Sequence, residues 1–310
     1  MKIRLFAAVV LFVLCAVGGF ASAMLPLVPG DAYLIVNFDF ASIVSQPELK
    51  TLIDTQLNSN EQAKDYTDFY ARAGIEPARD IKNVLVFLDS KERAGIIVSG
   101  SFDTAKISEL VQSDKELAAK FELVTIAGMQ TVKNAANANA NMMFVNQNTV
   151  AFGSEEILAQ VAALQAGKGK DISKNADFTG LMKKVDTSSQ LWGAVVAAPN
   201  WQSRVNVPVA GLESMKTAFF SVDYDKEFTM VFSGLVGDKK ELPKFAEAMK
   251  NLLDAFKGWV ASVPEMAELL KVAKIQDDKE NIAKIVVAIP ADQFKNTMIK
   301  LSEKANEQKK

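Results

Sequence analysis

The stretch VLVFLDSKERAGIIVSG, residues Val84–Gly100, carries the clearest information about the fold. Two apolar runs flank the charged segment Asp89–Arg93, which is the pattern of two strands joined by a turn. The first run, Val84–Leu88, is apolar at every position, so a strand formed there needs cover on both faces. We therefore expect an antiparallel sheet that packs against other parts of the chain.

A similar stretch occurs later, at AFFSVDYDKEFTMVFSG, residues Ala218–Gly234. The spacing between Asp89 and Asp223 equals the spacing between Gly100 and Gly234. We interpret the two stretches as matching parts of a divergent duplication. Chance alignment of two strand-turn-strand units is the alternative, because such units are common.

Segments with one apolar stripe surround both hairpins and predict amphipathic helices. Asp103 and Ser154 are placed to cap two of them. The predicted fold class is α+β, with two divergent repeats of antiparallel sheet, amphipathic helices on one face of each, and the repeats packed together. The predicted organisation is a signal peptide at 1–23, a first repeat at 24–166, a linker and helix at 167–187 and a second repeat at 188–310.

The first residues have the three parts of a secretory signal peptide in order. Lys2 and Arg4 precede the apolar run Leu5–Phe20, and Ala21-Ser22-Ala23 matches an A-x-A cleavage pattern. We expect cleavage before Met24 and export to the periplasm, the cell surface or the medium. A retained membrane anchor is the alternative, so contact with the membrane is expected only through this segment before cleavage.

Composition removes several chemistries. The 310 residues include no histidine, and the one cysteine, Cys15, lies inside the predicted signal segment. Histidine-dependent triads and histidine-ligated zinc are excluded. We expect no cofactor, no metal site and no disulfide in the exported chain. With 35 basic and 37 acidic residues and no basic stripe, we expect no nucleic-acid partner.

Three short elements resemble those of a broad set of uncharacterised exported bacterial proteins. The segment Gly74–Ile81 (GIEPARDI) is similar to their Gly-Ile-Asp-Pro-x-x-Asp-Ile element, with Glu76 in place of the aspartate. The segment Gly100–Asp103 (GSFD) matches their Gly-x-Phe-Asp element, and Pro29–Ala32 (PGDA) is similar to their opening. The resemblance implies an exported, duplicated α+β protein and brings no known active site with it.

Candidate sites are few. Gly167-Lys168-Gly169-Lys170 lacks the spacing of a phosphate-binding loop and is interpreted as a flexible, solvated linker. The carboxylates of Asp223, Asp225 and Glu227 are interpreted as a charged hairpin tip rather than a calcium loop. Trp201 and Arg204 lie in a polar segment, where they form a possible contact for a ligand or partner, although packing of the tryptophan is the alternative.

These features lead to three hypotheses. The first is an exported, non-enzymatic protein that binds a small ligand or another protein. The second is a hydrolase that uses carboxylates or a serine–lysine pair, which a cleft with a carboxyl of raised pKa would support. The third is a structural component of the cell envelope, which would have no pocket.

Overall fold

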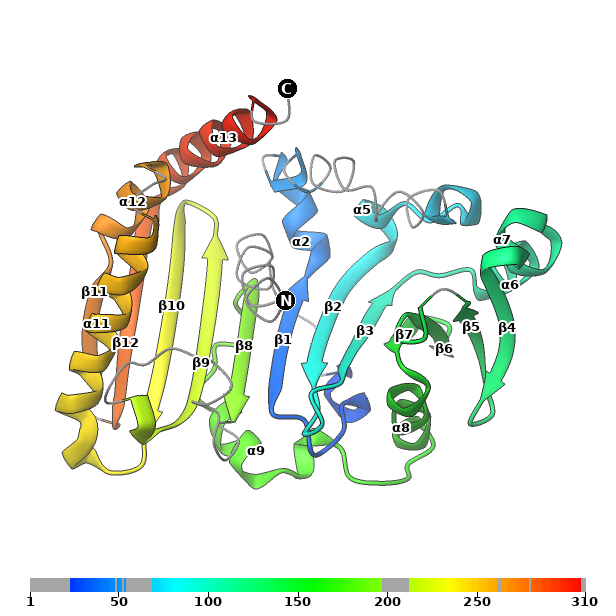
Figure 1. Cartoon of the computed structure of the whole chain (residues 1–310), viewed down its shortest axis with the longest axis horizontal. Helices are drawn as coiled ribbons and strands as arrows, with labels where there is room; N and C mark the ends of the chain where they lie inside the picture. Colours follow the sequence, from blue (N-terminus) through cyan, green and yellow to red (C-terminus); the bar gives the residue numbers. More distant parts are fainter. Residues whose placement is uncertain are drawn as a thin grey trace. The chain divides into compact units, whose positions relative to one another are not determined.

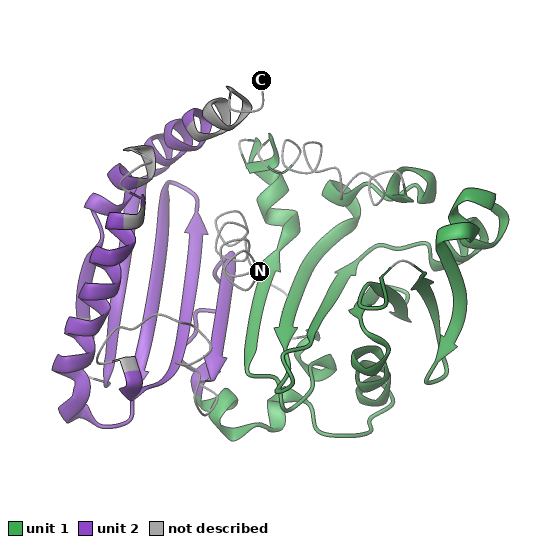
Figure 2. Cartoon of the chain, in the orientation of Figure 1, with its two compact units in different colours: residues 1–180 green, residues 181–310 purple. Residues whose placement is uncertain are grey.

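A computed structural model describes residues 23–47, 49–51, 53, 69–135, 137–196, 212–260, 264–278 and 280–307. The chain divides into two compact units, Met1–Gly180 and Leu181–Lys310 (Figure 2). Each unit contains antiparallel strands and helices, so the α+β class is confirmed (Figure 1). No described helix is both long enough and apolar enough to cross a membrane.

The first unit contains strands in the order β1-β2-β3-β7-β6-β5-β4. Their bounds are β1 Leu34–Asp39, β2 Ile81–Leu88, β3 Ala94–Gly100, β4 Phe121–Ile126, β5 Met129–Asn134, β6 Asn141–Asn146 and β7 Thr149–Gly153. Its helices are η2 Leu25–Leu27, α2 Phe40–Ser45, α5 Pro77–Asp80, α6 Thr104–Ser113, α7 Lys115–Lys120, α8 Glu155–Gln165 and η3 Ile172–Lys174. Helix α9, Ala176–Met182, spans the boundary between the units.

The second unit contains strands in the order β8-β9-β10-β12-β11. Their bounds are β8 Leu191–Val196, β9 Met215–Tyr224, β10 Glu227–Val236, β11 Lys274–Asp278 and β12 Ile282–Pro290. Its helices are η4 Leu212–Ser214, η5 Lys239–Glu241, α11 Leu242–Val260, α12 Pro264–Lys271 and α13 Ala291–Glu307.

The two predicted helix caps are confirmed. Asp103 Oδ1 accepts a hydrogen bond of 2.9 Å from the Lys106 amide at the start of α6. Ser154 Oγ accepts one of 3.4 Å from the Ile157 amide at the start of α8. Both side chains satisfy an amide that the first turn of a helix leaves without a partner.

Helices pack on both faces of the strands in the first unit. Ile107 and Val111 of α6 share a core cluster with Val98 and Val150, which face each other across β3 and β7. We call this side the α6 face. Side chains on β-strands alternate between faces, so Gly153 lies on the other side, where a Cβ would stand 2.8 Å from Ile157 of α8. We call that side the α8 face.

The second unit differs, because both of its long helices pack on one face. A Cβ on Gly234 of β10 would lie 2.3 Å from the ring of Phe245 in α11. Phe228, also in β10, lies on the same face as Gly234. Its ring stacks on Phe294 of α13, with ring centroids 4.2 Å apart and ring planes at 3° to each other. The expected one-sided arrangement therefore holds for α11 and α13, whereas α8 departs from it in the first unit.

The opposite face of the second unit we call the open face, defined by Thr229, Val231, Val286 and Ala288. Register places Thr229 opposite Ala288 and Val231 opposite Val286 across β10 and β12. All four side chains are partly exposed. The open face is therefore an accessible sheet surface with apolar side chains.

The predicted duplication is neither established nor excluded by these strands. The order β1-β2-β3-β7-β6 parallels β8-β9-β10-β12-β11, and the β4–β5 hairpin has no counterpart among the described strands of the second unit. The hairpin turns differ, since Leu88 pairs with Ala94 and Tyr224 pairs with Phe228. Asp223 lies within β9 rather than at its end, so the equal spacing seen in the sequence does not match equivalent positions.

Candidate functional site

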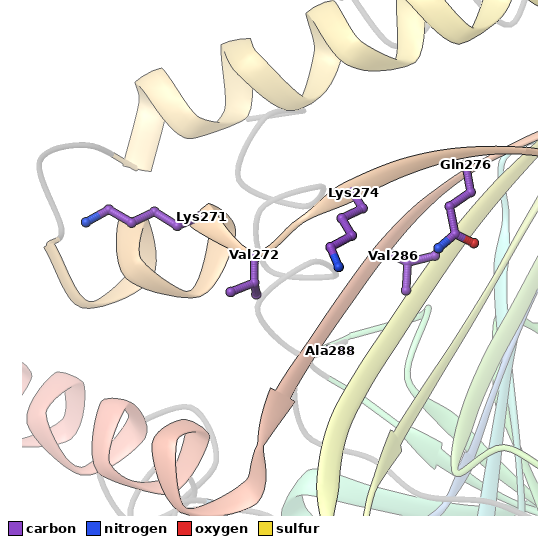
Figure 3. Close-up of a pocket in the computed structure, with 6 residues that line it drawn as sticks. All are labelled: Lys271, Val272, Lys274, Gln276, Val286 and Ala288. Atoms are coloured by element: carbon purple, nitrogen blue, oxygen red, sulfur yellow. The ribbon is translucent and has the colours of Figure 1, made fainter.

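A groove runs along the last strand pair of the second unit. It has a volume of about 400 Å³ and is lined by Lys271, Val272, Lys274, Gln276, Val286 and Ala288. Val286 and Ala288 belong to the open face, and Lys274 lies directly opposite Val286 in the register of β11 and β12. Figure 3 shows Val272, Lys274 and Val286 on one side of the strands, with Lys271 extending away at the end of α12. We call this the β11 groove.

Strand β11 is an edge strand in the described sheet, because it pairs with β12 and with no other described strand. An edge strand has a row of backbone amide and carbonyl groups that point away from the sheet. No described backbone group outside the sheet is bonded to residues 274–278. The β11 groove therefore lies beside backbone groups for which the described part of the chain provides no partner.

The described charged side chains that line the β11 groove, Lys271 and Lys274, are both cationic. Lys274 forms no ion pair with a described residue, and Lys271 pairs with Glu268 on its own helix. Val272 is 38% exposed and contributes apolar surface next to both lysines. The groove combines apolar contacts with positive charge, which suits an anionic occupant.

A second hollow lies in the first unit, around the segment interpreted as a linker. Its volume is about 530 Å³. Its lining includes Gly30, Gln160, three lysines and two aspartates; the charged residues are Lys168, Lys170, Lys174, Asp31 and Asp171. We call it the Gly30 hollow. Because both lysines and aspartates line the Gly30 hollow, its net attraction for an anion is weaker than three lysines alone would give.

The segment 167–174 is part of the first unit rather than a free linker. The Gly30 amide donates to Lys170 O at 2.8 Å, and the Ile172 amide donates to Val28 O at 2.9 Å. A Cβ on Gly30 would stand 2.7 Å from Lys170 O, so only glycine allows this approach. These backbone hydrogen bonds fix the Gly-Lys-Gly-Lys segment against residues 28–30.

Asp171 anchors the end of this segment. Burial acts to raise its pKa, but hydrogen bonds from the Ser173 hydroxyl and amide and the nearby Lys174 charge hold the pKa below its ordinary value. Asp31 accepts a hydrogen bond of 2.6 Å from Ser90 Oγ. Both carboxylates of the Gly30 hollow therefore have structural partners.

The residues proposed from the sequence fall in different places. Trp201, Arg204 and Ala21 lie outside the described residues. Ala23 is exposed and Met24 is 2% exposed, with its carbonyl accepting from the Leu27 amide at 2.9 Å. Asp223 is held by Ser189 Oγ at 2.7 Å and by the Gln190 amide.

The described residues provide little of what a metal site or a general acid would need. No group of three or more Asp, Glu, His or Cys there is arranged to hold a metal ion. Asp39 is the one described carboxyl whose pKa is raised, through burial, against hydrogen bonds from the Ser42 and Ala41 amides. It caps α2 and lines neither the β11 groove nor the Gly30 hollow.

Sequence reasoning missed both hollows. Lys274 and Val286 belong to the runs 272–275 and 285–289, which are typical of strands, but their relation to an edge depends on the strand order. No local signal in the sequence indicates that β11 pairs on one side only. The Gly30 hollow depends on contacts between residues near 30 and residues near 170, which a single sequence does not reveal.

Comparisons with known proteins assign no function to the chain. No protein-family model matches the chain, and no curated protein sequence matches it. A solved structure described as crystal form I of TP0453 aligns with a TM-score of 0.48 and 13% identity. The alignment covers 90% of this chain and 97% of that chain. Likeness at this level carries no argument about activity.

Proposed function

We propose that this protein is a non-enzymatic interaction protein that binds an extended segment of another polypeptide along β11. The observation that carries the proposal is the β11 groove, which lies beside an edge strand with free backbone groups. Proteins commonly bind extended peptides by adding them as a strand to such an edge. The backbone bonds supply affinity, and side chains in the groove supply selectivity.

The size of the edge suits a short segment. Strand β11 has five residues, and a partner strand of similar length would extend beside it. Val272 offers an apolar contact, while Lys274 and Gln276 offer polar ones. Val286 lies one strand further in, on β12. A binding mode that relies mainly on backbone pairing needs no deep pocket, which agrees with a groove at the surface.

Binding is favoured over hydrolysis by the chemistry of the two hollows. A hydrolase with two carboxylates needs an acid whose pKa is raised next to a substrate cleft. No carboxylate is among the described residues that line the β11 groove, and the carboxylates of the Gly30 hollow accept hydrogen bonds from serine side chains. The presence of two hollows also favours a binding role over a purely structural one.

Export is a part of this proposal and rests on the sequence. Lys2, Arg4, the apolar run and Ala21-Ser22-Ala23 support a cleaved signal peptide. N-terminal sequencing of the protein recovered from the envelope or the medium tests it. We expect Met24 as the first residue; a chain that begins at Met1 or Lys2 would contradict cleavage.

Two steps test the binding proposal. Peptides of about seven residues are selected from a displayed random library, and hydrogen exchange of the protein is then measured with and without each selected peptide. Selected peptides are expected to slow amide exchange in residues 274–278. The matched control is β4, the edge strand of the first unit, whose amides should not change. A library that yields no binding peptide, or peptides that protect other segments, would overturn the proposal.

A further inference from the structure

The two lysines of the β11 groove lie at one end of the strand. Lys271 closes α12, and Lys274 is the first residue of β11. Gln276, the other polar lining residue, is uncharged and lies further along the strand. The positive charge of the groove is therefore concentrated beside the start of β11.

Strand direction connects this charge to the sequence of the occupant. Strand β12 pairs antiparallel with β10 on one side and antiparallel with β11 on the other. Antiparallel pairing is also slightly more stable per residue than parallel pairing. An added antiparallel strand would place its C-terminal half beside Lys274, because the start of β11 faces the end of its partner.

We propose that the occupant is an extended segment that runs antiparallel to β11 and carries acidic side chains in its C-terminal half. The inference rests on the proposed function and specifies the chemistry of that same groove. Carboxylates at these positions would meet Lys274, which forms no ion pair with a described residue. Lys271, which pairs with Glu268 on its own helix and extends away from the strands, adds positive charge nearby. Acidic residues in the N-terminal half would lie away from both lysines.

Three synthetic peptides test the charge. The first alternates glutamate and valine in its C-terminal half and has threonine and valine in its N-terminal half. The second has the same residues in reverse order, and the third replaces each glutamate by glutamine. Exposed ion pairs are weak, so we expect the first peptide to bind about three- to tenfold more tightly than the other two at low salt.

Salt and charge reversal locate the effect. Raising the ionic strength should reduce the advantage of the first peptide, because exposed charges are screened. Lys274→Glu should abolish that advantage, whereas Lys239→Glu in η5, outside the groove, should preserve it. Equal affinities for all three peptides would overturn the proposed charge while leaving edge binding intact.

Cross-linking tests the direction. Val272 is exposed and lies next to Lys271, and Cys15→Ser removes the natural cysteine, so Val272→Cys in that background provides one thiol. A peptide with a C-terminal cysteine should form a disulfide faster than the same peptide with an N-terminal cysteine. The reverse preference would overturn the antiparallel direction. Failure of every peptide to bind would instead overturn the proposed function.

Discussion

The first unit has helices on both faces of its strands, whereas α11 and α13 cover one face in the second. On the α8 face of the first unit, Ile35, Leu85, Phe87 and Ile97 are fully buried. On the open face of the second unit, Val286 and its neighbours are partly exposed. Similar strand orders therefore give one buried sheet segment and one with an accessible surface.

The difference depends on where α8 packs in the first unit and where α13 packs in the second. Helix α8 follows β7 and contacts the face opposite α6, as the close approach of Ile157 to Gly153 shows. Helix α13 follows β12 and lies on the same face as α11, where Phe294 stacks on Phe228. The position of one helix decides whether a sheet face is part of a core or remains available for binding.

The largest expected effect is on the α8 face of the first unit. Phe87→Ala should lower the free energy of unfolding by about 3–5 kcal/mol, since it removes a fully buried ring. Urea unfolding followed by circular dichroism measures the change. A loss below about 1 kcal/mol would contradict the two-sided cover of this unit.

The next effect tests the helix-covered face of the second unit. Gly234→Ala places a Cβ 2.3 Å from the Phe245 ring, which must move for the methyl group to fit. We expect a loss of about 1–3 kcal/mol from overpacking. The double variant Gly234→Ala with Phe245→Leu should recover part of the loss, and the absence of any recovery would argue against this contact.

A pH experiment sharpens the comparison through Asp80 of the first unit. A hydrogen bond from Arg79 lowers the pKa of Asp80, whereas burial acts to raise it. A second hydrogen bond, from the Glu76 amide at 2.8 Å, lowers the pKa further. The folded state thus favours the charged form, so the stabilisation is present above the ordinary value of about 4 and is lost as pH falls through the lowered pKa.

Asp80→Asn should therefore lose less stability than the natural protein as the pH falls below about 4. Urea unfolding at a series of pH values measures the difference. The same pH dependence in both proteins would show that Asp80 does not contribute in this way.

The smallest effect is expected on the open face. Val286→Thr should change the free energy of unfolding by less than about 0.5–1 kcal/mol, because the side chain is partly exposed. In the matched variant Val98→Thr, the residue is 7% exposed and lies on the α6 face, so the substitution buries a hydroxyl. Its free energy of unfolding should fall by about 1–3 kcal/mol. Thermal unfolding of both variants checks this, and equal losses would show that the open face is covered.

The hairpins and caps could be predicted from the sequence because their signals are local. Val84–Leu88 and Gly95–Ser99 form β2 and β3, and Asp103 and Ser154 cap helices as expected. The apolar character of Phe121–Val132 is typical of a single strand region, but the segment contains the turn between β4 and β5. Gly128 there has a φ of 84°, which suits glycine, whereas Ala127 has a φ of 48°, which a residue with a Cβ seldom adopts.

The β11 groove could not be predicted because it depends on non-local pairing. The sequence indicates strands near 274 and 286, but β12 also pairs with β10, which leaves β11 at the edge. The Gly-Lys-Gly-Lys segment shows the same limit. Its composition is typical of a flexible linker, whereas backbone hydrogen bonds to the regions of Val28 and Ala163 fix it in place.

The bonds between the N-terminal segment and the Gly30 hollow have a consequence for the order of folding. Asn175 Nδ2 donates to Gly30 O across a sequence separation of 145 residues. Contacts between distant residues form late, because a long loop must close first. We therefore expect the residues around Gly30 to stay unfolded until the chain beyond residue 175 has been synthesised. For the export that we propose, such a delay would keep the polypeptide extended during its passage across a membrane.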